Sequence, residues 1–395
     1  MAKLIEITGK ALSGEWGKDD ETGNGIPVLR TTNFTNEGVI DYNSVVTRTI
    51  TKKNIGEKFL RKGDIIIEKS GGSEKFPVGR VVYFDGDDNT YLFNNFTGLL
   101  RVKEPKIWYP RYVFYSLFAN YKRGGTRMFE NKTTGLHNLK TDDYVSRYEV
   151  TEIDMFEQVS VCDKLDRLYE IVNERKQQLE LLDELVKARF VEMFGEPLEG
   201  TAKYPIHQVG EIANLVDPQP SHRTPPIDED GIPYVSIKDC DYKTGKINFE
   251  SARKVSRKVL EEHLNRYTLH DGDFVIGKIG TIGNPVFVPV SDDYTLSANV
   301  ILVQPNSELV SPYFLKFSFE SDYIKRQFIE AKNSTSQAAF GIQKVRMINV
   351  MNPDLSVQRE FEAFAKQIDK SKVAIQKSLD ETQILFDSLM QKYFG

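Results

Sequence analysis

The chain of 395 residues is poor in the residues that build redox and metal sites. It has two cysteines, Cys162 and Cys240, and five histidines. Two cysteines so far apart are too few for a disulfide framework or a zinc site, and the histidines share no metal-ligand spacing. We therefore expect inert thiols, imidazoles that are solvated or hydrogen-bonded in the core, and no metal site.

Long apolar runs are also missing. No stretch approaches the roughly 18 residues that a membrane crossing needs. The start, Met1-Ala2-Lys3, leads into no apolar segment of the signal type. The sequence predicts a cytoplasmic protein without a membrane partner.

Catalytic motifs are missing as well. The chain contains no H-E-x-x-H, no G-x-S-x-G and no G-x-G-x-x-G after a strand. The spacing from Gly272 to Lys278 fits a phosphate-binding loop, but Ile279 stands where that loop needs a hydroxyl. The Asn-Pro-Pro-aromatic motif of adenine methyltransferases is absent too. We interpret the chain as non-catalytic and expect it to bind no cofactor of its own.

The net charge of −5 argues against a non-specific polyanion binder. Residues 1–150 hold 23 Lys+Arg against 19 Asp+Glu, or +4, and residues 151–195 hold 6 against 11, or −5. Residues 196–350 hold 17 against 20, or −3. Any contact with DNA must therefore use local basic patches.

What the chain does have is a long amphipathic segment, Asp163–Phe190. Its apolar residues follow an alternating spacing of three and four, which is typical of a coiled-coil seam: Leu165, Leu168, Val172, Leu179, Leu182 and Val186. Gly195 and Pro197 supply the stop. The pattern predicts a helix of about 28 residues, or roughly 42 Å.

A partner for this helix lies at the end of the chain, where the same spacing returns in Ile368, Ile375, Leu379, Phe386 and Leu389. The two segments also end alike, in Met193-Phe194-Gly195 and Tyr393-Phe394-Gly395. We expect an antiparallel helix pair within one chain.

The segments before the two helices resemble each other. Ile26–Arg30 matches Ile232–Ser236, each as an entering strand. Gly63–Ile67 matches Gly272–Ile276, and the glycine-aspartate pair in each predicts a turn into a buried strand. Matched landmarks in the same order indicate an internal repeat. The predicted fold is α/β, with duplicated mixed α+β domains separated by two long antiparallel coiled-coil helices: 1–150 first domain, 151–195 first helix, 196–354 second domain, 355–395 second helix.

Each domain is also expected to contain an aromatic helix opened by a proline, at Tyr109–Tyr121 and at Tyr313–Phe328. The spacing of their aromatic residues is that of a buried helix face. We expect five of these side chains in the core: Phe114, Tyr115, Phe118, Phe314 and Phe317.

The glycine-rich stretch Gly277–Asn284 exposes backbone N–H groups beside Lys278 and Thr281, an arrangement that suits phosphate. A tight strand connection whose glycines only supply positive φ would look the same. Two polar stretches, Asn131–Thr134 and Asn333–Gln337, suit base edges or are ordinary surface loops. Five cations are candidates for phosphate contacts or are simply solvated: Arg30, Lys69, Lys75, Arg80 and Lys140.

The run Gly272-Asp273-Phe274-Val275-Ile276-Gly277-Lys278-Ile279-Gly280-Thr281-Ile282-Gly283, the preceding Ile232–Asp239 and the repeated order of domain and helix resemble the specificity subunits of type I restriction-modification systems. The resemblance spans essentially the whole chain and is stronger in the second half. It implies two target-recognition domains on a helical spacer, each reading one half of a split, asymmetric DNA sequence.

The resemblance further implies partners: double-stranded DNA, two methyltransferase subunits that bring S-adenosylmethionine, and restriction subunits that use ATP with Mg²⁺. The remaining candidate DNA contacts are Thr32, Ser70, Lys132, Thr133, Thr134, Lys238, Lys278, Thr281, Asn284, Ser334, Thr335, Ser336, Gln337 and Lys344. Two alternative functions stay open. One is a scaffold with two ligand-binding modules that does not bind DNA. The other is a self-sufficient methyltransferase, which the missing cofactor and catalytic motifs disfavour.

Overall fold

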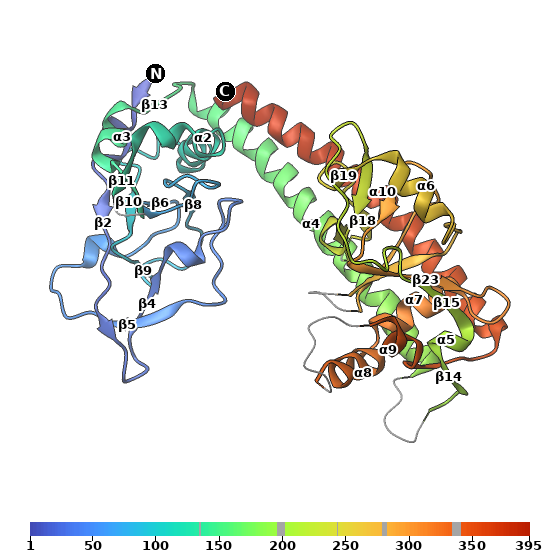
Figure 1. Cartoon of the computed structure of the whole chain (residues 1–395). Coiled ribbons are helices and arrows are strands. Elements are labelled where there is room, and N and C mark those ends of the chain that lie inside the picture. The colour runs from blue at the N-terminus through green and yellow to red at the C-terminus, as the bar shows by residue number, and fades with distance from the viewer. Residues whose placement is uncertain (134–135, 196–201, 243, 279–282, 334–340) are drawn as a thin grey trace. The chain divides into compact units, whose positions relative to one another are not determined.

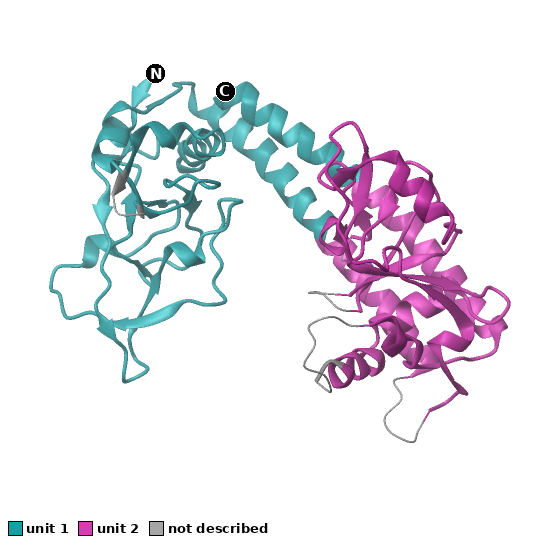
Figure 2. Ribbon diagram, viewed as in Figure 1, with its two compact units in different colours: residues 1–176, 377–395 teal, residues 177–376 magenta. Residues whose placement is uncertain are grey.

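A computed structural model describes residues 1–133, 136–195, 202–242, 244–278, 283–333 and 341–395 (Figure 1). The chain forms two compact units (Figure 2), residues 1–176 with 377–395 and residues 177–376. Each unit therefore contains one domain, part of the first long helix and part of the second.

Unit 1 is built on two four-stranded sheets. The first is antiparallel throughout, in the order β2 (Leu12–Ser13), β10 (Thr97–Leu100), β6 (Ile65–Glu68), β8 (Val81–Tyr83). The second has the order β3 (Lys18–Asp19), β5 (Val46–Thr49), β4 (Ile26–Leu29), β9 (Leu92–Phe93), with β4 and β9 parallel. The strands of the first sheet are rich in buried aliphatic residues because both faces are covered.

Shorter elements complete unit 1. The helices are α1 (Leu4–Thr8), α2 (Pro110–Lys122) and α3 (Thr141–Arg147), with 3₁₀ turns η1 (Thr31–Asn33), η2 (Gly56–Lys58) and η3 (Gly125–Phe129). β1 (Ala2–Lys3) pairs with β13 (Glu149–Val150), and β7 (Ser70–Gly71) joins β11 (Glu130–Thr133) and β12 (Leu136–Leu139).

Unit 2 repeats this topology. Its main sheet has the order β15 (Ala213–Val216), β23 (Val300–Pro305), β20 (Phe274–Gly277), β21 (Pro285–Phe287). A second sheet, β19 (Arg253–Val255), β16 (Ile232–Val235), β22 (Thr295–Leu296), again contains one parallel pair, β16 with β22. The same strand order in both units confirms the predicted fold class, duplicated mixed α/β.

The other elements of unit 2 fall in the same order. They are α5 (Val209–Ile212), α7 (Pro312–Glu320), α8 (Asp322–Asn333), α9 (Ile342–Arg346), η4 (Ile237–Asp239), and the pair β14 (Ile206–Gln208) with β24 (Asn349–Met351). Unit 2 adds α6 (Arg257–Leu264) and the hairpin β17 (Cys240–Asp241) with β18 (Lys246–Ile247).

The two long helices are α4 (Met155–Phe194) and α10 (Leu355–Phe394), each of 40 residues. The prediction of about 28 residues for the first was wrong: the seam spacing begins only at Leu165, whereas Asp154 opens the helix by accepting a hydrogen bond from the Glu157 N–H at 2.8 Å. At the far end Gly195 has φ +75° and closes the last turn.

The helices are antiparallel where they meet in unit 2. Arg189 lies 3.2 Å from Glu360 and Asp183 lies 2.6 Å from Lys372, so the residue number rises along α4 as it falls along α10. All the seam residues named above are buried or half-buried, with Leu165, Val172, Val186, Leu379 and Phe386 at 9% exposure or less.

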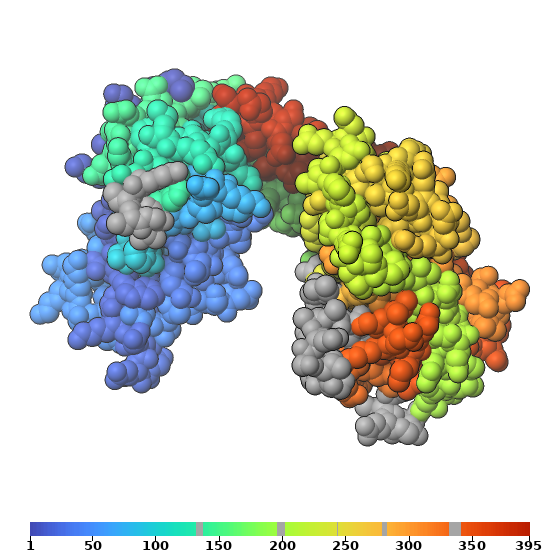
Figure 3. Space-filling model, viewed as in Figure 1, coloured from blue at the N-terminus to red at the C-terminus, as the bar shows by residue number. Residues whose placement is uncertain are grey.

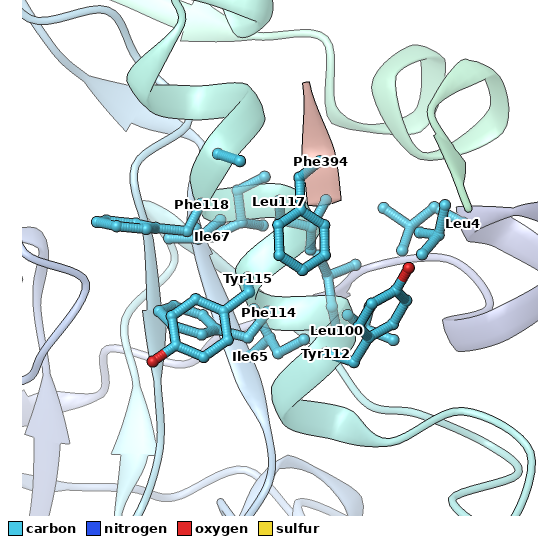
Figure 4. Packing of buried hydrophobic residues seen from close by; sticks show 14 of the residues in the cluster. Leu4, Ile65, Ile67, Leu100, Tyr112, Phe114, Tyr115, Leu117, Phe118 and Phe394 are labelled. Carbon is cyan, nitrogen blue, oxygen red and sulfur yellow. The ribbon is translucent and has the colours of Figure 1, made fainter. Parts of the chain in front are cut away.

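Each unit closes its core with the last aromatic residue of a long helix. In unit 1 the Phe394 ring lies 5.2 Å from the Tyr112 ring, centroid to centroid, among the side chains of α2 (Figure 4). In unit 2 the Phe194 ring lies 4.7 Å from that of Phe314 on α7. Burying an aromatic side chain contributes about 1.5–3 kcal/mol, so each helix end stabilises one unit.

The aromatic helices differ from the prediction in two respects. Proline opens both, at Pro110 and Pro312. The expected single helix Tyr313–Phe328 is wrong, because the chain breaks at Ser321, whose extended backbone (φ −69°, ψ 152°) separates α7 from α8. Phe114, Tyr115, Phe118 and Phe314 are buried as expected, but Phe317 is only half-buried and packs against Phe361.

Candidate nucleic-acid interface

Unit 2 contains a polar cavity of about 380 Å³. Its lining comes from β16, η4, β19, the end of β20, the loop after β22 and the segment after β15, and consists of His222, Thr224, Tyr234, Ser236, Lys238, Arg253, Lys278, Ser297, Ala298 and Asn299. The space-filling view shows the yellow-green segment that carries β18 beside the gold segment that carries α6 (Figure 3). Two predicted DNA contacts, Lys238 and Lys278, are thus brought to one site.

Lys278 sits at the floor of this site. Its Nζ donates to Asp217 Oδ2 at 2.5 Å, and only 5% of the lysine side chain is exposed. Its backbone N–H donates to the carbonyl of Asn299 at 2.9 Å, which joins the ends of β20 and the β22–β23 loop. The buried ammonium is stable there because a carboxylate faces it.

A buried histidine holds the wall formed by residues 217–224. The two ring nitrogens of His263 on α6 lie 2.7 Å from Thr295 Oγ1 and 2.6 Å from Gln219 Oε1. Burial lowers the pKa of His263 to about 4, and Arg266 adds to the shift, so the ring is neutral at neutral pH. Gln219 in turn donates to Ser221 Oγ at 2.9 Å, which orders the wall.

Unit 1 has a lysine at the matching position after β6. The Lys69 backbone N–H donates to the Phe96 carbonyl at 2.8 Å, as Lys278 does to Asn299. Its Nζ donates to Ser13 Oγ at 2.6 Å. Burial lowers the pKa of Lys69, since it disfavours the charged form of the side chain. The hydrogen-bond partner of this ammonium group is a hydroxyl group, which offsets that cost less than a carboxylate would.

The two arginines predicted to contact phosphate in unit 1 make internal contacts. Arg80 donates to the carbonyls of Phe34 at 2.8 Å and Thr31 at 2.9 Å, and lies 3.3 Å from Glu68. Arg30 donates to the Ser44 carbonyl at 2.9 Å. Both guanidinium groups therefore shape the loops beside η1.

The remaining predicted contacts are spread over both units. Thr32, Lys75 and Lys140 are exposed in unit 1, and Ser70 donates to Asn138 Oδ1 at 2.7 Å. In unit 2, Asn284 is half-buried and Lys344 donates to the Ala331 carbonyl at 2.5 Å. Outside the described residues lie Thr134, Thr281, Ser334, Thr335, Ser336 and Gln337, together with the side chains of Lys132 and Thr133.

The glycine-rich stretch is described at both ends. Gly283 has φ +83°, and a Cβ there would lie 2.8 Å from the Phe328 ring, so this glycine is required for conformation and for packing. The two interpretations of the stretch as a phosphate loop or a tight connection both remain, because Ile279–Ile282 are not described.

Sequence reasoning missed Arg253, His222, Ser297 and Asn299 of the cavity. A signal for the first was present, since four cations fall within Arg253–Lys258 on a strand and the helix after it. The other three are single polar residues on two loops, His222 on the loop after β15 and Ser297 and Asn299 on the loop after β22. Only the pairing of β16 with β19 and β22 brings them together.

Metal ligands, thiols and long apolar helices can be stated for the described part of the chain. It contains no group of three or more acidic, histidine or cysteine side chains placed to hold a metal ion. Cys162 and Cys240 are buried, and burial raises the pKa of Cys240 to about 12, which keeps the thiol protonated. None of the described helices has the length and apolarity of a membrane span.

Comparison with known proteins gives a consistent picture. Residues 208–383 match the family model "Type I restriction modification DNA specificity domain". The structure resembles the type I restriction-modification S subunit from M. genitalium, with a TM-score of 0.60 at 15% identity over 100% of this chain and 95% of that one.

A chain from a structural study of complex assembly and conformational transition in the type I R-M system is similar too, with a TM-score of 0.53 at 15% identity over 100% and 96% of the two chains. No curated protein matches in sequence. Residues 208–383 thus carry the type I restriction-modification DNA specificity domain, and the chain has the fold of those S subunits over its whole length.

Proposed function

We propose that the chain reads a bipartite, asymmetric DNA sequence, one half with each domain. The observation that carries this proposal is the repeat: both units have the same strand order, yet the polar side chains at matching positions differ, as with Arg30 and Ser236 or Ser13 and Asp217. A shared framework with different polar residues suits two related readers of two different half-sites.

The long helices serve as the spacer in this proposal. At 1.5 Å per residue, 40 residues extend over about 60 Å. Lengthening both helices together by four residues, near Glu174 and Lys377, adds roughly 6 Å while nearly preserving the seam. DNA rises about 3.4 Å per base pair, so the unread segment between half-sites should grow by one or two base pairs.

The helices also dock two methyltransferase subunits, in the cytoplasm. Support comes from apolar side chains left exposed on the helices, Leu181, Leu185 and Val373 in unit 2 and Ile384 and Leu385 in unit 1. S-adenosylmethionine binds to those partners, and ATP with Mg²⁺ to restriction subunits. The isolated chain should transfer no methyl groups and cleave no DNA.

The test is methylation profiling of DNA from cells that express the chain with its methyltransferase partner. We expect one split motif. Replacing Asn284 and Thr281 by alanine should weaken or relax one half, at about 1–3 kcal/mol for each lost base contact, and replacing Lys132 and Thr133 the other half. A continuous motif, or a change of both halves by either pair, would contradict the proposal; binding partners other than nucleic acid would favour the scaffold.

A further inference from the structure

The cavity in unit 2 is electropositive, although the part of the chain around it has a net negative charge. Lys238, Arg253 and Lys278 line it, and no aspartate or glutamate does. The surrounding residues 196–350 carry a net charge of −3. We propose that this cavity is a phosphate anchor, which seats one backbone phosphate of the half-site read by unit 2; the proposal rests on the proposed function.

The lining supplies the donors that a phosphate requires. Besides the three cations it offers the hydroxyl groups of Thr224, Ser236 and Ser297 and the amide of Asn299. Lys238 is exposed at the rim, on η4. A volume of about 380 Å³ lies in the range of pockets that hold small ligands, so a phosphodiester and its sugar fit.

Arg253 provides a second, independent observation. One of its terminal nitrogens donates to the Pro225 carbonyl at 2.8 Å, which fixes the guanidinium in place. Its Nε is buried and has no hydrogen-bond partner among the described groups. The Nε atoms of Arg30 and Arg80 in unit 1 are buried without a partner as well, so this observation supports the anchor together with the fact that Arg253 lines the cavity.

The site is also pre-organised. Asp217 holds Lys278, and the neutral His263 ring holds Gln219, so the wall of residues 217–224 is tied at two points. Arg266 adds a third tie, a hydrogen bond to the Pro218 carbonyl at 3.2 Å. Donors that are fixed before binding lose little conformational freedom when the ligand arrives.

A phosphate suits this lining better than a base edge does. Asp217 neutralises only one of the three cations, so two positive charges remain for a ligand. A base edge is neutral and would leave them uncompensated, whereas a phosphate carries a negative charge with oxygen atoms on several sides.

The test measures DNA affinity of the complex of the chain with its methyltransferase partner, on its own target duplex and on an unrelated duplex, from 50 to 200 mM salt. Lys238→Gln removes the exposed rim charge without disturbing the core. We expect affinity for both duplexes to fall by the same factor, roughly tenfold at 0.1 M salt, and the slope of log K against log salt to become shallower by about 0.9, the value for one phosphate. The methylated motif should stay the same.

Lys258→Gln is the matched control, because Lys258 is an exposed lysine of α6 that does not line the cavity. Equal slopes for the two variants would overturn the phosphate anchor, and so would a motif relaxed at particular base pairs, which would indicate base reading. Arg253→Lys, which keeps the charge, should lower affinity less than Arg253→Gln; circular dichroism checks that both are folded. A wild-type complex that shows no sequence preference would refute the proposed function itself, separately from the anchor.

Discussion

The two units place a lysine at the same point of the same sheet but surround it differently. In unit 2 Lys278 faces the carboxylate of Asp217 at 2.5 Å, whereas in unit 1 Lys69 faces the hydroxyl of Ser13 at 2.6 Å. In unit 1 the buried carboxylate belongs to Glu68, the residue before Lys69, and it lies 3.3 Å from Arg80. Both units therefore have a pair of opposite charges at this end of the main sheet, at neighbouring positions.

The comparison separates framework from surface. The shared features are backbone positions and caps: Gln158 accepts from the Tyr109 N–H and Gln358 from the Ser311 N–H, both at 2.8 Å. The differing features are polar side chains at the ends of strands. A sheet tolerates such changes at the ends of its strands where each buried charge still faces an opposite charge or a hydroxyl group.

The largest expected effect comes from the helix ends. Phe194→Ala should lower the free energy of unfolding of unit 2 by about 3–5 kcal/mol, since the side chain is 1% exposed and surrounded by other aromatic rings. Phe394→Ala should cost unit 1 less, because that residue is 7% exposed.

Chemical denaturation followed by tryptophan fluorescence and hydrogen exchange measures both changes. The two tryptophans, Trp16 and Trp108, lie in unit 1 and report on it, while exchange of β20 and β23 reports on unit 2. Equal losses in both variants would show that the helix ends contribute alike in the two units.

The next effect tests the lysine comparison. Asp217→Ala leaves the ammonium of Lys278 buried without a carboxylate, which should destabilise unit 2 by about 3 kcal/mol. Ser13→Ala removes one hydrogen bond to a more exposed Lys69 and should cost unit 1 about 1–2 kcal/mol. The double variant Asp217→Ala with Lys278→Met should recover much of the loss; failure to do so would mean that Asp217 acts through something other than Lys278.

A pH dependence should distinguish the units as well. The folded-state pKa of His263 is about 4, below the ordinary value of 6.5, so the folded protein binds fewer protons than the unfolded chain between these values. The stabilisation is complete above pH 6.5 and declines as the pH falls toward 4, by at most about 1.4 kcal/mol per pH unit.

Hydrogen exchange of β22 and α6 between pH 7 and pH 4.5 measures this decline. Thr295 and Gln219 contact the ring, and Arg266 and Glu262 are the charged groups that act on it. His263→Gln should remove most of the pH dependence of unit 2, and tryptophan fluorescence of unit 1 is the internal control. A variant with an unchanged pH profile would assign the dependence to other groups.

The smallest effect on stability is expected on the exposed faces of the helices. Leu181→Ser with Leu185→Ser should change the free energy of unfolding by no more than about 0.5 kcal/mol for each site, since 54% and 46% of these residues are exposed. The same double variant should weaken methyltransferase binding in a pull-down of the purified partner. Glu180→Gln with Glu184→Gln on the same helix is the control, and equal binding by both variants would place the docking surface elsewhere.

Many of the strands and helices were predictable, because short sequence patterns mark where they begin. Buried strands such as β6 and β20 follow a glycine-aspartate turn, and Pro110 and Pro312 each open a helix. The break at Ser321 was not predictable, because the apolar spacing continues across it and the backbone alone interrupts the helix. Helix length was underestimated since the first turns of α4 pack on the domain, outside the seam.

The residues that line the cavity were predictable only in part. Lys238 and Lys278 were named from the chain for their charge, but Arg253, Ser297 and Asn299 join them only through non-local strand pairing. The counter-ion of Lys278 is 61 residues away, and its counterpart in unit 1 is a serine.

The sequence by itself determined the repeat, the two helices and their antiparallel partnership, because apolar periodicity and turn residues act over short distances along the chain. Only the tertiary structure decided which polar side chains share a site and which lysine has a carboxylate. These depend on contacts between residues far apart in sequence, where the free energy of burying a charge is set by whatever group the fold brings opposite it.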